Sequence, residues 1–139
     1  MPVVRINGLT TVLPGQVYVL PENVVIKIRN GIIRPEQRPA EAGINRSIDI
    51  FFESLAEDQT DKAIGVILSG MGSDGAKGVM KIHEMGGAVM VQEPASADFS
   101  SMPWAAIIKD NPDFIVPPPQ MASKLQLLMR QRTTVRSNT

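Results

Sequence analysis

Short runs of β-branched and aromatic residues alternate with polar segments in the first third of the chain. These runs cover residues 16–20, 24–29 and 32–34, and their composition is typical of strands. Asn30 and Gly31 separate the last two runs, and both residue types tolerate the positive φ of a tight hairpin turn. The pattern predicts a small antiparallel element, with a β-hairpin, at this end of the chain.

A loop and then a helix are predicted next. Residues 35–45 are rich in Pro, Glu, Arg and Gly without an apolar period, which indicates an exposed loop. Ser47 follows as a candidate helix N-cap. The next apolar residues have the i, i+3, i+4, i+7 spacing of one buried helical face: Ile48, Phe51, Phe52 and Leu55. We expect this helix to cover a sheet.

The middle of the chain carries the pattern of a βαβ unit. Residues 63–68 are apolar throughout, as in a parallel strand buried on both faces, and residues 88–91 form a second run of this kind. A helical pattern lies between them and stops at Gly86 and Gly87, because glycine readily adopts the left-handed conformation that ends helices.

The last third predicts a short helix, a short strand and a longer helix. Pro103 lies in the first turn of the short helix, where proline is tolerated, and residues 113–116 form the strand. After the prolines at 117–119, an amphipathic helix is expected to bury a stripe made of Met121, Leu125, Leu128 and Met129. Residues 131–139 are polar and without a period, which indicates a frayed end or a linker.

Composition narrows the function classes. At 139 residues the chain fits one domain, and its 14 basic and 14 acidic residues leave no net charge or basic patch that would favour nucleic acid. With no cysteine and a single histidine, neither a disulfide nor a Cys/His metal site is expected. No apolar stretch approaches the length of about 20 residues that a membrane span needs, so we expect a cytoplasmic protein without membrane insertion.

The glycine-rich turn at residues 70–75, Gly-Met-Gly-Ser-Asp-Gly, joins the first buried strand to the next helix. One interpretation is a dinucleotide-binding fingerprint that uses Gly70, Gly72 and Gly75, with Glu93 as the ribose-binding acid 18 residues further on. Against it, Asp74 would place a carboxylate where the pyrophosphate should lie. The other interpretation is a hydrolase in which Asp74 belongs to a catalytic triad.

Asp74 is also expected to stabilise the N-terminus of the helix that follows it, and that role is compatible with catalysis. His83 lies nine residues along the same helix, about 13 Å away by helical rise, so it is excluded as the triad partner of Asp74 and interpreted as a helix-surface or boundary residue. None of the nearby serines lies in a G-x-S-x-G elbow, and turn or cap roles are predicted for Ser69, Ser73, Ser96, Ser100 and Ser101.

Several motifs in the same order resemble one known family. The turn SGMGSDG after AIGVIL, followed by IHEMGGAVMVQEPASADFSSMPWAAI, is similar to the C-terminal part of chemotaxis-receptor methylesterases of the CheB type. The resemblance covers residues 12–128 and includes VLPGQVYVLPEN, NRSIDIFFESLAEDQ and PDFIVPPPQM, the last two being closest to versions fused to a receptor methyltransferase. It implies an α/β fold, a doubly wound, Rossmann-like parallel sheet in three layers.

In that family a serine attacks the methyl ester of a receptor glutamate, a histidine transfers protons, and an aspartate orients the histidine. The resemblance assigns the aspartate role to Asp74 and one oxyanion-hole N–H to the backbone of Met71, with no cofactor and no metal. It places the serine and histidine ahead of this chain. Residues 1–131 are therefore expected to be the C-terminal portion of an N-terminally truncated catalytic domain that is nearly inactive alone, followed by a tail at 132–139.

The resemblance also implies partners. Methyl-accepting chemotaxis receptors would be the substrates, with glutamine deamidation as a related activity, and a receiver domain or a receptor methyltransferase would be a fused or separate partner. Two alternatives remain open: a non-catalytic module that binds a receptor or another partner, and the dinucleotide-binding unit described above.

Overall fold

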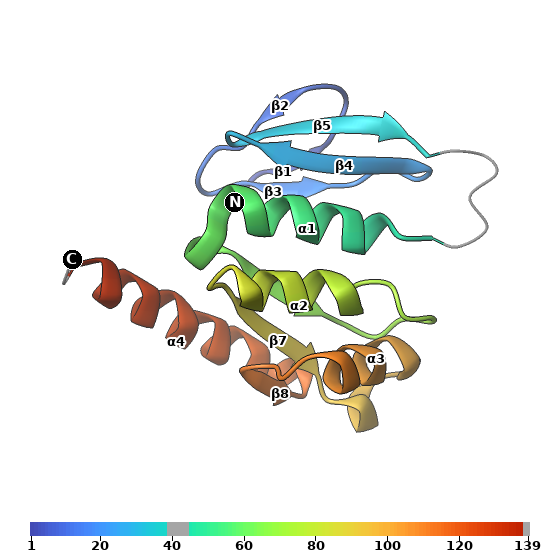
Figure 1. Ribbon diagram of the computed structural model, residues 1–139, viewed down its shortest axis with the longest axis vertical. Helices are drawn as coiled ribbons and strands as arrows, with labels where there is room; N and C mark the ends of the chain where they lie inside the picture. Colours follow the sequence, from blue (N-terminus) through green and yellow to red (C-terminus); the bar gives the residue numbers. More distant parts are fainter. Residues whose placement is uncertain (39–44, 138–139) are drawn as a thin grey trace.

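The computed structural model describes residues 1–38 and 45–137 (Figure 1). Its strands are β1 (Val3–Arg5), β2 (Thr10–Thr11), β3 (Val17–Val19), β4 (Val24–Arg29), β5 (Ile32–Gln37), β6 (Ile64–Ile67), β7 (Ala88–Gln92) and β8 (Phe114–Val116). Its α-helices are α1 (Ser47–Gln59), α2 (Ala76–Glu84), α3 (Ser101–Lys109) and α4 (Pro118–Ser137). Short 3₁₀ turns lie at Thr60–Lys62 and Pro94–Ser96.

The second half of the chain is an α/β unit. Strands β6, β7 and β8 pair in parallel in that order, and α2 connects β6 to β7, so the predicted βαβ unit is confirmed. Every residue of β7 is buried, as expected of a central strand. Gly86 has φ +92° just beyond α2, which confirms the predicted helix stop.

Strand β6 differs from its prediction. It was expected to be buried on both faces, but Ile64 and Val66 are only half-buried while Gly65 and Ile67 are buried. The reason is its position at an edge of the sheet, where no described strand pairs with its other side. One face of β6 packs on the core, and the other lies against an apolar hollow described below.

The predicted hairpin is confirmed. Strands β4 and β5 pair antiparallel from Val24↔Gln37 to Arg29↔Ile32, and Asn30 and Gly31 in the turn have φ +53° and +71°. Strand β5 runs to Gln37, so residues 35–37, expected in a loop, belong to the strand. Pro35 is accommodated because β2 pairs only with Ile32 and Ile33, and no described strand pairs with the far side of β5 at Pro35. Residues 39–44 of the expected loop lie outside the described residues.

The remaining N-terminal strands correct the antiparallel prediction. Strand β3 pairs in parallel with β1, from Val3↔Val17 to Arg5↔Val19, rather than with β4. Ile6, just after β1, donates its N–H to the Val19 carbonyl and is 2% exposed among Ile26, Ile28 and Ile33. Burial of Ile6 in this cluster therefore brings β1 beside β3, a long-range effect that local periodicity does not report.

Helix α1 lies between two apolar clusters. Ile48 and Phe52 pack against the core of the parallel sheet, Phe51 packs against the cluster under the antiparallel sheet, and Leu55 touches both. The helix thus covers a sheet, as predicted, and its other side contacts α2 (Figure 1). Ser47 is its first residue rather than its N-cap, because a carboxylate from another part of the chain caps the helix.

Helix α4 differs from its prediction in its buried stripe of residues and in the position of its C-terminal end. Leu128 is buried and Met121 and Leu125 are half-buried, but Met129 is 53% exposed. The helical backbone also continues to Ser137, past the point where a frayed end was expected. The residues after Gln131, apart from Val135, are polar, so the sequence there has no apolar period although the backbone is helical as far as Ser137.

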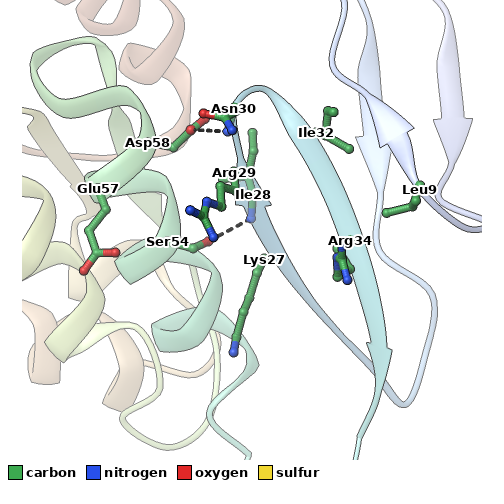
Figure 2. Close-up of a pocket in the computed structure, with 10 residues that line it drawn as sticks. All are labelled: Leu9, Lys27, Ile28, Arg29, Asn30, Ile32, Arg34, Ser54, Glu57 and Asp58. Atoms are coloured by element: carbon green, nitrogen blue, oxygen red, sulfur yellow. Dashed lines mark hydrogen bonds between the residues drawn. The ribbon is translucent and has the colours of Figure 1, made fainter.

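The C-terminal half of α1 holds the hairpin in place (Figure 2). The Ser54 hydroxyl accepts the Ile28 N–H at 3.0 Å, and the Asp58 carboxylate accepts the Asn30 N–H at 2.5 Å. The same carboxylate accepts the Gly31 N–H at 3.2 Å. Burial tends to raise the pKa of Asp58, but hydrogen bonds from Gln59, Gly31 and Asn30 lower it below its ordinary value. The carboxylate is therefore the form that the hairpin turn binds.

Asp58→Ala is expected to lower the free energy of unfolding at pH 7 by about 1 to 2 kcal/mol, because two turn N–H groups lose their acceptor. Since the folded pKa is depressed, this contribution is present above the unfolded pKa of about 4 and disappears as the pH falls through the folded pKa. Urea denaturation of the variant and of Glu57→Ala, its exposed neighbour, at pH 7 and pH 3 measures this. An equal loss at both pH values would contradict the expectation.

Candidate active site

The glycine-rich turn follows the carboxyl end of β6 and leads directly into α2, which confirms the predicted strand-turn-helix junction (Figure 1). Gly72 and Gly75 have φ +85° and +99°. A Cβ on Gly75 would lie 2.7 Å from Ile67 Cδ1 and 3.1 Å from Ile48 Cγ2, so a side chain there is excluded by both backbone conformation and space. In parallel α/β sheets this edge is where ligands bind.

Asp74 is held rigidly at this edge by the start of α1. Its Oδ2 accepts the Ile48 N–H and its Oδ1 accepts the Asp49 N–H, both at 2.9 Å. The expectation that Asp74 caps its own helix is therefore wrong. The N-terminus of α1 lies against the turn, and its free N–H groups take the carboxylate instead.

Asp49 has the reciprocal capping role at the N-terminus of α2, and this role was not predicted from the sequence. It is 4% exposed, and its Oδ1 accepts the N–H groups of Gly75 and Gly78 at 2.9 and 2.8 Å. Asp74 thus caps α1, the helix that contains Asp49, and Asp49 caps α2, the helix that follows Asp74. A signal existed: Asp49 shares a helical face with Phe52 and Ala56, and a carboxylate on a buried face requires hydrogen-bond donors.

This arrangement gives Asp74 the properties of an orienting group. Each carboxylate oxygen of Asp74 has two lone pairs, of which one accepts an α1 N–H. The other lone pair of each oxygen remains, so the half-buried side chain can still accept an imidazole N–H. The positive end of the α1 dipole favours the negative charge. The carboxylate is therefore fixed in direction and available as an acceptor.

Met71 lies at the tip of the turn, with 73% of its surface exposed. Within residues 1–38 and 45–137 its N–H has no hydrogen-bond acceptor. The turn around it is tied to the segment before α3: the Gly70 N–H donates to the Phe99 carbonyl at 2.9 Å, and the Ser69 hydroxyl donates to the same carbonyl at 3.2 Å. The site thus presents a free N–H donor on an anchored loop.

An apolar hollow of about 580 Å³ opens beside the turn. Its walls come from the N-terminal strands, α1 and the half-buried face of β6, and it reaches Leu68, Ser69 and Met102 next to the glycines. Phe51, Phe52 and Leu55 line it from α1. Apolar walls of this extent suit the packing of a further chain segment against β6.

His83 lies at the other end of α2 from Asp74, so its exclusion as the triad partner stands. Its two ring nitrogens are engaged, with Nδ1 2.7 Å from Asp110 Oδ2 and Nε2 2.7 Å from Asp113 Oδ2. Burial tends to lower the pKa of His83, but the hydrogen bonds and charges of Asp113 and Asp110 raise it above 6.5. The half-buried ring agrees with the predicted helix-surface or boundary position. It also links α2 to Asp110 just after α3 and to Asp113 just before β8, a role that was not predicted.

The protein is expected to lose stability as the pH rises through the raised pKa of His83. The contribution of the paired imidazolium is fully present below the unfolded pKa of about 6.5 and is lost above the folded value, because neutral imidazole donates to only one carboxylate. Unfolding free energies from pH 5 to 9 for the wild type and for His83→Gln measure this. The wild-type curve should fall toward that of the variant, whereas Glu84→Gln should follow the wild type; parallel wild-type and His83→Gln curves would contradict it.

The other candidates have structural roles. Ser69, Ser96 and Ser101 hydrogen-bond to backbone groups of the turn and the following loop, in line with the predicted turn roles. The α2 N–H groups of Gly75 and Gly78, which a pyrophosphate would need, are occupied by Asp49, and this disfavours dinucleotide binding by Gly70, Gly72, Gly75 and Glu93.

Two further properties concern the described residues as a whole. In residues 1–38 and 45–137 no group of three or more His, Asp or Glu side chains could hold a metal ion. Across the same part of the chain no helix is both long and apolar enough to cross a membrane.

Comparison with known proteins identifies what this chain resembles. The sequence profile of the CheB methylesterase family matches residues 1–125. A putative protein-glutamate methylesterase/protein-glutamine glutaminase of Leptospira interrogans is 40% identical over 103 residues, which cover 73% of this chain and 53% of that protein. Protein-glutamate methylesterase/protein-glutamine glutaminase 2 of Rhizobium johnstonii is 32% identical over 135 residues, 94% of this chain and 34% of that protein.

A solved structure agrees with these sequence relatives. The crystal structure of the Thermotoga maritima CheB methylesterase catalytic domain superposes with a TM-score of 0.73 at 29% identity, over 86% of this chain and 65% of that one. The α/β fold expected from the sequence is thereby confirmed. The chain spans about half or less of the length of the two sequence relatives.

Proposed function

Because this chain belongs to the CheB methylesterase family, we propose that it supplies part of the active site of a protein-glutamate methylesterase/protein-glutamine glutaminase. The proposed substrates are methylated glutamate side chains of chemotaxis receptors, acted on in the cytoplasm without a cofactor. The observation that carries the proposal is the Asp74 carboxylate, which the N–H groups of Ile48 and Asp49 fix at the carboxyl edge of the parallel sheet. Fusion to a receptor methyltransferase stays a prediction.

In the proposed mechanism a serine oxygen attacks the ester carbonyl while a histidine takes the serine proton. Asp74 orients that histidine and stabilises its positive charge, and the Met71 N–H donates to the oxyanion. The histidine then returns the proton to the departing methoxide, which leaves as methanol. Water attacks the acyl-enzyme in the same way and releases the glutamate carboxylate and the serine.

We propose that the serine and the histidine come from a segment of the protein other than these 139 residues. Three observations support this. His83 is engaged by Asp110 and Asp113 at the far end of α2. The acceptor positions left on Asp74 face no histidine within the described residues. The hollow beside the turn and the unpaired edge of β6 offer an apolar surface against which such a segment can pack.

The test is methanol release from receptor membranes that carry radiolabelled methyl-glutamates. The whole protein should release methanol, while the 139-residue chain alone should be slower by several orders of magnitude because it lacks the nucleophile and the base. Receptor binding by the whole protein without methanol release would overturn the proposal and favour a non-catalytic receptor-binding module. Rapid release by the chain alone would refute the assignment of the serine and histidine to another segment.

A further inference from the structure

We propose that Ser101 is a positioning residue whose hydroxyl fixes the direction of the Met71 N–H toward the oxyanion. This inference rests on the proposed function, since it concerns how the same turn is held. Ser101 is the first residue of α3, 30 positions beyond Met71 in the sequence. Neither the spacing of the turn nor its glycines points to this serine.

The Ser101 hydroxyl bridges the two peptide groups that flank Met71. It donates to the Gly70 carbonyl at 3.3 Å and accepts the Gly72 N–H at 3.0 Å. The Met102 N–H donates to the same Gly70 carbonyl at 3.1 Å. One side chain thus contacts the backbone on both sides of the proposed oxyanion donor.

The Gly70 carbonyl and the Met71 N–H belong to one peptide plane. The described chain has no cis peptide bond, so the two groups point in opposite directions. Because the carbonyl points toward the first turn of α3, the Met71 N–H must point away from α3, and it has no acceptor within the described residues. Fixing the carbonyl therefore fixes the donor.

This turn needs such an anchor. Glycines on both sides of Met71 give the peptide soft dihedral angles, and the Met71 side chain is too exposed to hold it. A flipped Gly70–Met71 peptide would aim a carbonyl oxygen at the developing oxyanion and would break the bonds from Ser101 and Met102. The Ser101 hydroxyl and the Met102 N–H together favour the peptide orientation in which the Met71 N–H can donate to the oxyanion.

The anchor is itself rigid. Pro103 and Ala106 are fully buried in α3, and the Ser69 hydroxyl pairs with the backbone of Phe99 just before the helix. A Cβ added to Gly70 would lie 2.9 Å from Met102 Sδ, which shows how closely α3 approaches the turn. The hydroxyl is therefore presented from a fixed backbone.

The test compares Ser101→Ala with wild type in the whole protein, using methanol release. We expect kcat to fall about tenfold, the factor that one net hydrogen bond supplies, with KM unchanged within about twofold, because the oxyanion exists only in the transition state. Ser101→Thr, which keeps the hydroxyl, should restore most of kcat. Ser123→Ala is the matched control, since Ser123 also donates to a backbone carbonyl but lies on α4.

A second readout separates positioning from folding. The serine oxygen adds to the carbonyl carbon of a trifluoromethyl ketone analogue of the ester, the serine proton passes to the histidine, and the former carbonyl oxygen becomes an oxyanion in the site. Its affinity should fall in Ser101→Ala by the same factor as kcat. Unchanged kcat and analogue affinity in an active protein would overturn this inference alone, whereas a wild type that releases no methanol would overturn the proposed function.

Discussion

Replacing Asp74 with asparagine in the whole protein is expected to lower kcat for methyl-ester hydrolysis by about four orders of magnitude. An amide presents the histidine with a neutral group and the wrong hydrogen-bond pattern, so the ring is neither oriented nor stabilised as a cation. The structure adds a second consequence. Both oxygens of Asp74 accept α1 N–H groups, and an amide nitrogen would face one of these donors, so we expect an accompanying loss of about 1 to 2 kcal/mol of stability.

Asp49→Asn separates the two consequences. Both N–H groups that Asp49 binds share its Oδ1, so the amide oxygen can keep both hydrogen bonds, and a stability loss of about 1 kcal/mol with less than a tenfold change in kcat is expected. Methanol release and urea denaturation of the two variants make the comparison. If Asp74→Asn kept a kcat within tenfold of wild type, the assignment of Asp74 as the orienting aspartate would be wrong.

Gly78→Ala is expected to destabilise the protein by about 2 to 3 kcal/mol and to reduce activity. A Cβ on Gly78 would lie 2.6 Å from Phe52 Cβ and 3.2 Å from Asp49 Cα, so α1 would have to move away from α2. Such a movement would also pull the α1 N-terminus away from Asp74. The measurement is urea denaturation together with kcat for the whole protein.

The direction of this effect is informative because helix propensity predicts the opposite. In an exposed helix interior, alanine is more favourable than glycine by about 1 kcal/mol. Lys77→Ala is the matched control, since Lys77 is the exposed neighbour of Gly78 on α2, and it should change the free energy of unfolding by less than about 0.5 kcal/mol. A Gly78→Ala protein as stable as wild type would show that α1 and α2 are not in the close contact described here.

Local patterns in the chain predicted the elements that depend on local conformation. The Asn30–Gly31 hairpin, the βαβ unit and the helix stop at Gly86 follow from residue types that tolerate particular dihedral angles and from periods of burial. The motif resemblance placed Asp74 and Met71 in a catalytic turn, and those roles stay predictions. The family and the α/β fold it implied are confirmed.

Tertiary packing decided the hydrogen-bond partners. Asp74 and Asp49 cap each other's helices across 25 to 29 residues, His83 binds carboxylates about 30 residues away, and Ser101 reaches back to Gly70. Periodicity reports which face of an element is buried, but not which donor from a distant segment meets a given acceptor. The sequence by itself determined where the turn lies and which residues belong to it. The packing of α1 and α3 against that turn decided the directions of the Asp74 carboxylate and the Met71 N–H. The reason is that the N-termini of α1 and α3 supply the hydrogen-bonding groups that orient them.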